Sequence, residues 1–437
     1  MRNDVFANGV CYLQLEFDLE GLPDAAFDLL PLYGDALVKM GAAGMDYVRM
    51  AERVAAHTGG IGFAAGADGL VQGPGAVRRS AAFSLKALDG ALEPALAVLR
   101  DLLFEPDFAD RERLRDVVVQ AHAAHRGALV EDGVGLALRH AGRGLGERGR
   151  LLERMGGLPQ VRLVERWARD FDAHFEALRD GLAALTRQFL NRRAFAASFT
   201  GSGPAAQAAR KALDGWAAAM RDEPLAPGAR DPFVQAAPPR EGLAAPMEVA
   251  FCAQVLPAPH LSHPDTPALT VASRILSLGY MWDEVRLKGG AYDAGALYGP
   301  LDGNFCCYSY RDPWIRKTLA RFKGLKEFVA RANWSQLEID RAIIGAAKHG
   351  EKPIRPGEAT AAALWRHTHG DTPARREARH AALLDVTPAD AKRAAAELLE
   401  RQDELAAVCV VSSRAMLEQA NAEPGDGQLA VEDILTT

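Results

Sequence analysis

The sequence has little of what membrane, nucleic-acid-binding or disulfide-rich proteins need. No apolar run approaches the roughly 18 residues of a membrane span, and the first residues, MRNDVFANGV, show no charged-then-apolar signal. The net charge of -6 offers no general basic surface for nucleic acid. Five cysteines in 437 residues do not make a disulfide framework, which favours a reducing compartment. We therefore expect a globular protein that binds neither a membrane nor nucleic acid.

Common catalytic motifs are also missing. The eleven histidines form neither H-x-x-E-H nor H-E-x-x-H, and the sequence has no C-x-x-C, no G-x-S-x-G and no G-x-x-x-x-G-K-[ST]. A catalytic zinc needs two histidines on one helical face, a third ligand and a carboxylate base. Three close histidine pairs lack that carboxylate in either motif order: His122 with His125, His260 with His263, and His367 with His369. We therefore expect no metal site in this chain.

A proline-rich stretch divides the chain almost in the middle. Residues 222–246 hold six prolines, a density that disfavours a helix or a central strand. We expect a first domain at 1–222, a linker at 223–246, a second domain at 247–420 and a mobile acidic tail at 421–437.

The two halves show the same order of expected elements. Residues 10–18 alternate as a strand, and a strand is also expected at 247–256. Each is followed by helix, two strands, several helices, a strand and a helix. An amphipathic helix spans the apolar positions Leu178, Leu182, Leu185 and Phe189. This repetition predicts an α+β protein of two similar domains, each a mixed β-sheet covered by helices.

One segment, WDEVRLKGGAY at residues 282–292, combines groups that suit a binding site. A helix is expected to end near Arg286, and Gly289 and Gly290 permit a sharp turn into a strand that begins at about Tyr292. A guanidinium and a phenol at one corner suit a developing oxyanion. The alternative is structural: Arg286 pairs with Asp283, Tyr292 is an ordinary strand residue and the glycines are a helix cap.

At this segment the sequence resembles the C-terminal half of the presequence proteases, which belong to the pitrilysin and insulinase superfamily of zinc peptidases. The resemblance rests on RILSLGYMWDEVRLKGGAYDAGALYGPLDGNFCCYSYRDP at 274–313, with NGVCYLQLEFDLEGLP, LPLYGDALVKMG and HTGGI in the first half and IDRAIIGAAKHGEKP at 339–353. It covers nearly the whole chain except the tail after about residue 420.

The resemblance implies one half of a clamshell that closes around a chamber. In this family the N-terminal half carries H-x-x-E-H and the zinc, while an arginine and a tyrosine of the C-terminal half hold the scissile carbonyl. Those two positions match Arg286 and Tyr292, and Gly289 and Gly290 are expected to help bind substrate. Expected partners are a zinc-bearing N-terminal half, on the same chain or a separate subunit, and unfolded peptides. A departure is Asp293, which replaces the small residue expected after the tyrosine.

Two other functions remain open at this point. Relatives in the superfamily have become non-catalytic structural or regulatory subunits, and exposed sheet edges can bind peptides by strand addition. Because a decayed scaffold has no need of Arg286, Gly289, Gly290 and Tyr292, we favour the substrate-binding half of a zinc endopeptidase. This chain by itself is expected to be inactive. Its alanine-rich composition, with arginine in excess of lysine, suggests a bacterial source and hence a cytoplasmic location.

Overall fold

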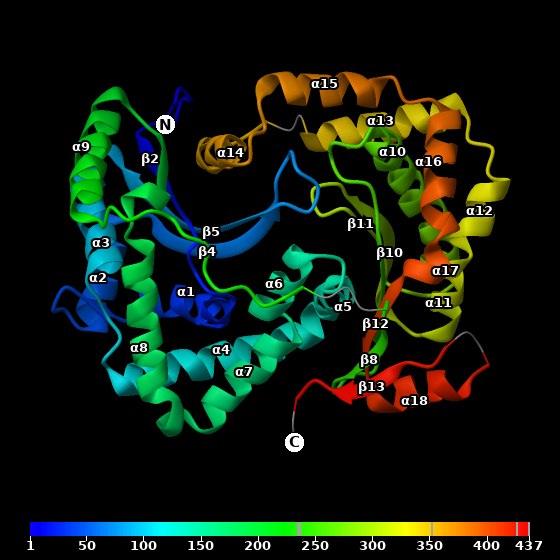
Figure 1. The fold of residues 1–437 in the computed structure, drawn as a ribbon, viewed down its shortest axis with the longest axis horizontal. Coiled ribbons are helices and arrows are strands. Elements are labelled where there is room, and N and C mark those ends of the chain that lie inside the picture. The colour runs from blue at the N-terminus through cyan, green and yellow to red at the C-terminus, as the bar shows by residue number, and fades with distance from the viewer. Residues whose placement is uncertain (234–236, 351–352, 425–426, 436–437) are drawn as a thin grey trace.

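The computed structural model describes residues 1–233, 237–350, 353–424 and 427–435, which form two large sheets with helices around them (Figure 1). The first sheet has the order β1-β7-β2-β5-β4. Its strands are β1 (Arg2–Asn3), β2 (Val10–Asp18), β4 (Gly60–Gly69), β5 (Val77–Leu88) and β7 (Phe195–Thr200). Along β2 the alternation predicted from the sequence holds, because Leu13, Leu15 and Phe17 are buried.

The second sheet has the order β10-β11-β9-β12-β8-β13. Its strands are β8 (Arg240–Ala244), β9 (Ala250–Pro257), β10 (Asp293–Gly299), β11 (Asn304–Asp312), β12 (Ala407–Ser412) and β13 (Ala430–Asp433). Adjacent Cys306 and Cys307 face opposite sides of β11, as expected for neighbours on a strand. A further two-stranded ladder joins β3 (Gly41–Ala42) and β6 (Pro106–Asp107).

The two sheets share one topology. In the first, β2 lies between β7 and β5 in antiparallel register, β5 pairs with β4, and β1 runs parallel to β7. In the second, β9 lies between β12 and β11 in antiparallel register, β11 pairs with β10, and β8 runs parallel to β12. This correspondence confirms the predicted α+β fold of two similar domains with mixed sheets.

Most helices of the first half pack on the first sheet and form the first core. Leu178, Leu182, Leu185 and Phe189 are buried on one helix, as predicted, and Asp46 caps the helix that begins at Tyr47 through the Arg49 amide. The helices are α1 (Leu30–Lys39), α2 (Tyr47–His57), α3 (Leu92–Phe104), α4 (Arg111–Glu131), α5 (Gly133–Gly142), α6 (Glu147–Gly156), α7 (Leu158–Arg169), α8 (Phe171–Phe189) and α9 (Gly203–Ala219), with 3-10 turns η1 (Asp24–Asp28), η2 (Asp89–Ala91) and η3 (Arg192–Ala194).

Most helices of the second half cover one face of the second sheet and build the second core. They are α10 (Thr266–Leu276), the π-helical segment η4 (Ser277–Leu287), α11 (Arg316–Lys323), α12 (Leu325–Arg331), α13 (Gln336–Gly350), α14 (Pro356–Thr368), α15 (Pro373–Leu384), α16 (Pro388–Glu400), α17 (Gln402–Leu405) and α18 (Arg414–Ala422).

Each half lends a helix to the sheet of the other (Figure 1). Helix α5 packs on the second sheet, where Leu136 and Ala137 join Phe251 in a shared core. Helix α14 packs on the first sheet, where Thr360 bonds Thr200 across a 2.6 Å Oγ1–Oγ1 distance. We call the α5-covered face of the second sheet its inner face. The exchange ties the two domains together, with α5 packed on β9, β12 and β11 of the inner face.

The structure corrects two local expectations about the linker and the tail. Strand β8 lies within the range expected to be linker, because Pro238 and Pro239 precede it and leave its amides free to pair with β12. Strand β13 lies within the range expected to be a mobile tail: it pairs with β8, and Ile434 after it is buried. The remaining domain boundaries stay predictions.

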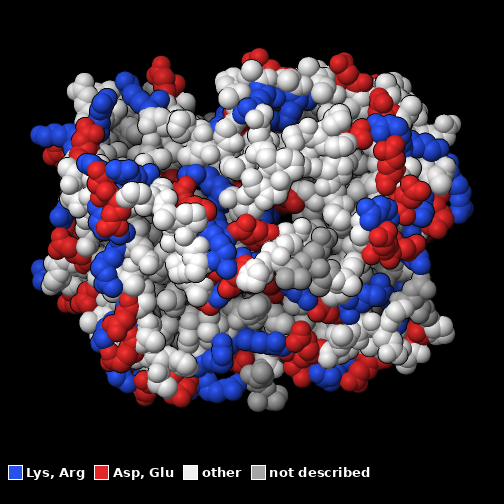
Figure 2. Space-filling model, viewed as in Figure 1, with Lys and Arg blue, Asp and Glu red and all other residues white. Residues whose placement is uncertain are grey.

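Two surface properties bear on the classes of protein considered above. In the part of the chain that the structure describes, no helix has both the length and the apolar character to cross a membrane. On the face shown in Figure 2, acidic and basic side chains are interspersed rather than gathered by sign.

Candidate functional site

The predicted site lies at a helix-to-strand corner whose backbone requires its two glycines. Helix α10 continues as η4, whose wider π-type turn is closed by the Lys288 amide bonding the Asp283 carbonyl at 2.9 Å. A Cβ at Gly289 would lie 2.1 Å from the Val285 carbonyl oxygen, and Gly290 has a φ of +87°. Both positions therefore have a backbone reason to be glycine. Their predicted role in substrate binding stays a prediction.

Arg286 lies on η4 against an aromatic ring. Its guanidinium carbon is 3.8 Å from the centre of the Trp282 ring, one turn earlier. Among the described residues Arg286 forms no ion pair, so the structural alternative of a pair with Asp283 is not what the structure contains. The nearby cation Lys288, by contrast, is paired with Glu284. The side chain is thus oriented by a cation–π contact worth about 0.5–1 kcal/mol, with its five N–H donors left for other groups.

Tyr292 directly precedes β10 rather than lying within it. Its amide donates to the Tyr310 carbonyl at 3.0 Å, and its ring centre lies 6.1 Å from that of Tyr310. The side chain is 69% exposed, and within the described ranges its hydroxyl has no hydrogen-bond partner. Tyr310 itself belongs to the inner face, where it packs on Phe251 and donates to the Glu131 carbonyl. Tyr292 therefore stands at the rim of the inner face with a free polar end.

The structure brings Arg286 and Tyr292 to one corner but not into contact. Each has its own aromatic neighbour, Trp282 for the arginine and Tyr310 for the tyrosine. No hydrogen bond or cation–π contact joins the two side chains in the described part of the chain. Each side chain is therefore held by its own aromatic neighbour and not by the other.

Asp293, the departure from the family pattern, is occupied within the sheet. Its Oδ2 accepts the Tyr308 hydroxyl at 3.1 Å, across to the neighbouring strand β11. Burial is the main cause, and the neighbouring Asp293 a further cause, that raise the pKa of Tyr308 to about 12. The carboxylate thus has a structural partner of its own beside Tyr292.

The histidine pairs have separate structural surroundings rather than a common ligand site. Burial lowers the pKa of His125 on α4. His260 Nε2 lies 2.9 Å from the Leu70 carbonyl oxygen, in a loop contact between the domains. His369 stacks on Trp365 with ring centres 4.4 Å apart, and burial lowers its pKa.

Two protein-family models match the chain, and together they cover well over half of it. The model of the domain associated with peptidases of family M16, subfamily C, matches residues 1–166, and the "PreP C-terminal domain" matches residues 261–414. Among curated proteins, presequence protease 1 of Arabidopsis thaliana is 25% identical over 424 residues, 97% of this chain and 39% of that protein. The mitochondrial presequence protease of Danio rerio is 25% identical over 406 residues, 87% of this chain and 39% of that protein.

Solved structures share the fold at low sequence identity. A crystal structure of a peptidase M16 inactive domain from Pseudomonas fluorescens has a TM-score of 0.67 at 16% identity and covers 99% of this chain and 96% of that chain. The periplasmic protease PqqL of Escherichia coli has a TM-score of 0.61 at 13% identity, with 94% of this chain covered and 44% of that one. The two-domain fold is therefore that of the M16 peptidases.

Within that class the sequence matches are specific. The chain belongs to the presequence protease family, and it corresponds to the C-terminal half of those proteins. It spans about two fifths of the length of the curated relatives that it matches.

The same relatives correct one expectation from the sequence. Composition suggested a cytoplasmic location, but the relatives are named as mitochondrial proteins or, in Arabidopsis thaliana, as chloroplastic and mitochondrial. The expectation of a cytoplasmic location was wrong, because alanine and arginine content reflects the base composition of the gene and contains no targeting information.

Proposed function

We propose that this chain supplies the substrate-binding wall of a zinc-dependent endopeptidase that degrades unfolded peptides in a closed chamber. The presequence proteases that it resembles are about two and a half times longer, which leaves room for a second, zinc-bearing half. In this proposal Arg286 and Tyr292 hold the scissile carbonyl, and Gly289 and Gly290 shape the corner that presents them.

The observation that carries the proposal is the free hydroxyl of Tyr292. The ring lies beside Tyr310 at the rim of the inner face, but its hydroxyl has no structural partner among the described residues. Arg286 on the other side of the corner is likewise without an ion pair in the described part of the chain. A neutral O–H donor and a permanent cation are groups that stabilise negative charge building on a carbonyl oxygen.

The residues of this chain do not fit the catalytic zinc of the family. His122 and His125 share α4, but no carboxylate of the described residues bonds either ring, and the other histidine pairs lie in a loop and at a helix end. Zinc, when bound elsewhere in the complete enzyme, would supply the activated water for peptide hydrolysis. The contribution of this chain is then to bind and orient: Tyr292 donates its O–H to the carbonyl oxygen, and Arg286 supplies a fixed positive charge.

The experiment compares variants of this chain with the zinc-bearing half present, in one polypeptide or added back. Tyr292→Phe removes only the hydroxyl and should lower kcat roughly 10²–10³-fold, the usual loss of one oxyanion donor. Arg286→Lys keeps the charge but not the planar fork, and should also be impaired. Tyr47→Phe is the matched control, because Tyr47 is a half-exposed tyrosine with its own cation–π contact to Arg113, far along the chain.

Near-normal kcat and kcat/KM in Tyr292→Phe would refute the role of the tyrosine. The competing function, a structural or regulatory subunit, predicts that all three variants behave like the parent in any peptide-cleavage assay.

A further inference from the structure

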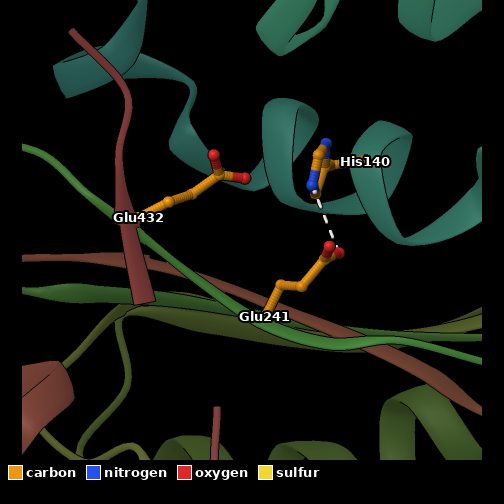
Figure 3. A group of neighbouring side chains, drawn as sticks. All are labelled: His140, Glu241 and Glu432. Atoms are coloured by element: carbon orange, nitrogen blue, oxygen red, sulfur yellow. Dashed lines mark ion pairs between the residues drawn. The ribbon is translucent and has the colours of Figure 1, made fainter. Parts of the chain in front are cut away.

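Three potential metal ligands from distant parts of the chain meet where α5 packs on the second sheet. His140 comes from α5, Glu241 from β8 and Glu432 from β13. One ligand atom of each lies within 4.8 Å of the others. In Figure 3 the imidazole of His140 points down at the carboxylate of Glu241, and Glu432 extends toward them from one side.

Two of these donor atoms are buried without a hydrogen bond. His140 is only 4% exposed, and its Nε2 forms no hydrogen bond within the described ranges. Glu241 Oε2 lies 3.2 Å from that nitrogen, yet the two are not aligned as a hydrogen bond and Oε2 has no other partner in the described part of the chain. The two atoms form an ion pair without hydrogen-bond geometry, and a buried polar atom without a hydrogen bond costs about 1–3 kcal/mol, so a ligand held between them would satisfy both.

The second ring nitrogen of His140, Nδ1, contacts a carboxylate, as is common for metal-binding imidazoles. Its Nδ1 lies 2.6 Å from Glu153 Oε1 on α6, and that oxygen also accepts the Leu158 amide. A carboxylate on the second ring nitrogen fixes the tautomer and directs Nε2 to the metal side, the usual arrangement around histidine ligands.

Each acidic residue is oriented in a similar way by an arginine. Arg143 donates to Oε1 of Glu241 at 2.7 Å, and Arg162 donates to Oε2 of Glu432 at 2.8 Å. One oxygen of each carboxylate is therefore occupied, and the other is left for a ligand. Ligating carboxylates are commonly held by such outer hydrogen bonds.

We propose that His140, Glu241 and Glu432 bind one divalent first-row transition-metal ion such as Zn²⁺. The 3.2 Å between Nε2 and Oε2 is close to the ligand separation of roughly 3.3 Å expected when two donors each lie about 2.0–2.1 Å from a tetrahedral metal. One imidazole with two carboxylates suits Zn²⁺ or Mn²⁺ and disfavours Mg²⁺, which prefers oxygen ligands only. The sequence gives no sign of the site because its ligands are far apart along the chain.

The role of such an ion is structural. It would join α5 of the first half to β8 and the C-terminal strand β13 of the second half, at the shared core. It has one histidine and lies beside two arginines, so it is unlike the two-histidine hydrolytic sites and is independent of the proposed peptidase role.

The test is Zn²⁺ titration of the purified, chelator-stripped chain by calorimetry, with Mg²⁺ as a comparison ion. We expect one saturable Zn²⁺ per chain and a rise in Tm on binding. Glu432→Gln replaces a partly exposed ligand and should weaken Zn²⁺ at least ~10-fold; Glu153→Gln should weaken it ~10–100-fold as an outer-shell change. Glu418→Gln on α18 is the control, since Glu418 is an exposed acid that pairs with nearby Arg414.

Circular dichroism of the metal-free variants shows whether each is folded. If Glu432→Gln is folded, its weaker Zn²⁺ binding results from the lost ligand and not from unfolding. No saturable Zn²⁺ binding to the parent chain would overturn the proposal and leave a simple ion-pair cluster. Equal Zn²⁺ affinity in Glu432→Gln and the parent would also overturn it, since the ion would then lie elsewhere.

Discussion

A buried carboxylate, Asp24, holds several segments of the first domain together. It is 1% exposed, and its oxygens accept Arg79 Nη1 at 2.5 Å, Arg150 Nη2 at 2.6 Å and the Asp231 amide at 2.8 Å. Its own amide donates to the Ala229 carbonyl, so the group also fixes the proline-rich segment on the domain. We expect Asp24→Asn to destabilise the first domain.

The size of the loss follows from two independent estimates. Burial alone raises the pKa of Asp24, but the Asp231 amide and the two arginines outweigh it and lower the pKa from 3.8 to about 2. That lowering corresponds to about 2 kcal/mol of folded-state stabilisation. Removing one partner of a buried ion pair usually costs ~3–5 kcal/mol, but Arg79 keeps Glu147 as a second partner. We therefore expect a loss of about 2–3 kcal/mol at neutral pH.

The assay is urea unfolding of the parent chain and Asp24→Asn between pH 2 and 7. Because the folded-state pKa lies below the unfolded one, the contribution is complete above about pH 5 and disappears as the pH falls through 3.8 toward 2. The two chains should therefore converge in stability at acid pH. Asp35→Asn, at an exposed pair with Lys39, should change nothing measurable. Equal stabilities at pH 7, or a gap that persists unchanged to pH 2, would refute the reasoning.

Three further results are expected. Gly133→Ala should lower the free energy of unfolding by about 1–3 kcal/mol, because the added Cβ would lie 2.4 Å from the Phe251 ring where α5 meets the second sheet. Gly127→Ala is the control, because a Cβ at Gly127 would have no atom within 4 Å, and its free energy of unfolding should stay close to that of the parent. Gly289→Ala should displace the corner and lower peptide cleavage by the reconstituted enzyme, while Gly279→Ala, in open space on the preceding helix η4, should not; equal activities would contradict this. The chain alone should release no product from a fluorogenic unfolded peptide, and zinc-dependent turnover by it would show that a catalytic site was overlooked.

The helices and strands that depend only on neighbouring residues could be predicted from the sequence. The alternation of β2 and the buried stripe of α8 depend on periods of two and 3.6 residues. Because the same order of elements recurs, the repeated fold could also be predicted.

Features that depend on distant partners could not be predicted in the same way. Strand β8 is short and follows two prolines, so its identity comes from the parallel pairing with β12 and not from its own sequence. Strand β13 likewise depends on β8, and the exchange of α5 and α14 between the sheets depends on the completed domains. The π-helical turn of η4 has no sequence signature beyond the glycines that follow it.

At the corner formed by residues 286–292, some residues are explained by the backbone and others only by a function. Gly289 and Gly290 are explained by the backbone, since one Cβ would strike a carbonyl and the other residue has a positive φ. Their presence in the sequence therefore does not discriminate between an active half and a scaffold that merely retains the fold. Tyr292 is different, because its ring is 69% exposed beside Tyr310 and its hydroxyl, which has no bond in the described structure, does not stabilise the corner. The glycine turn positions Tyr292, but the turn does not need the Tyr292 hydroxyl. Replacing Tyr292 by Phe therefore tests function without disturbing the fold.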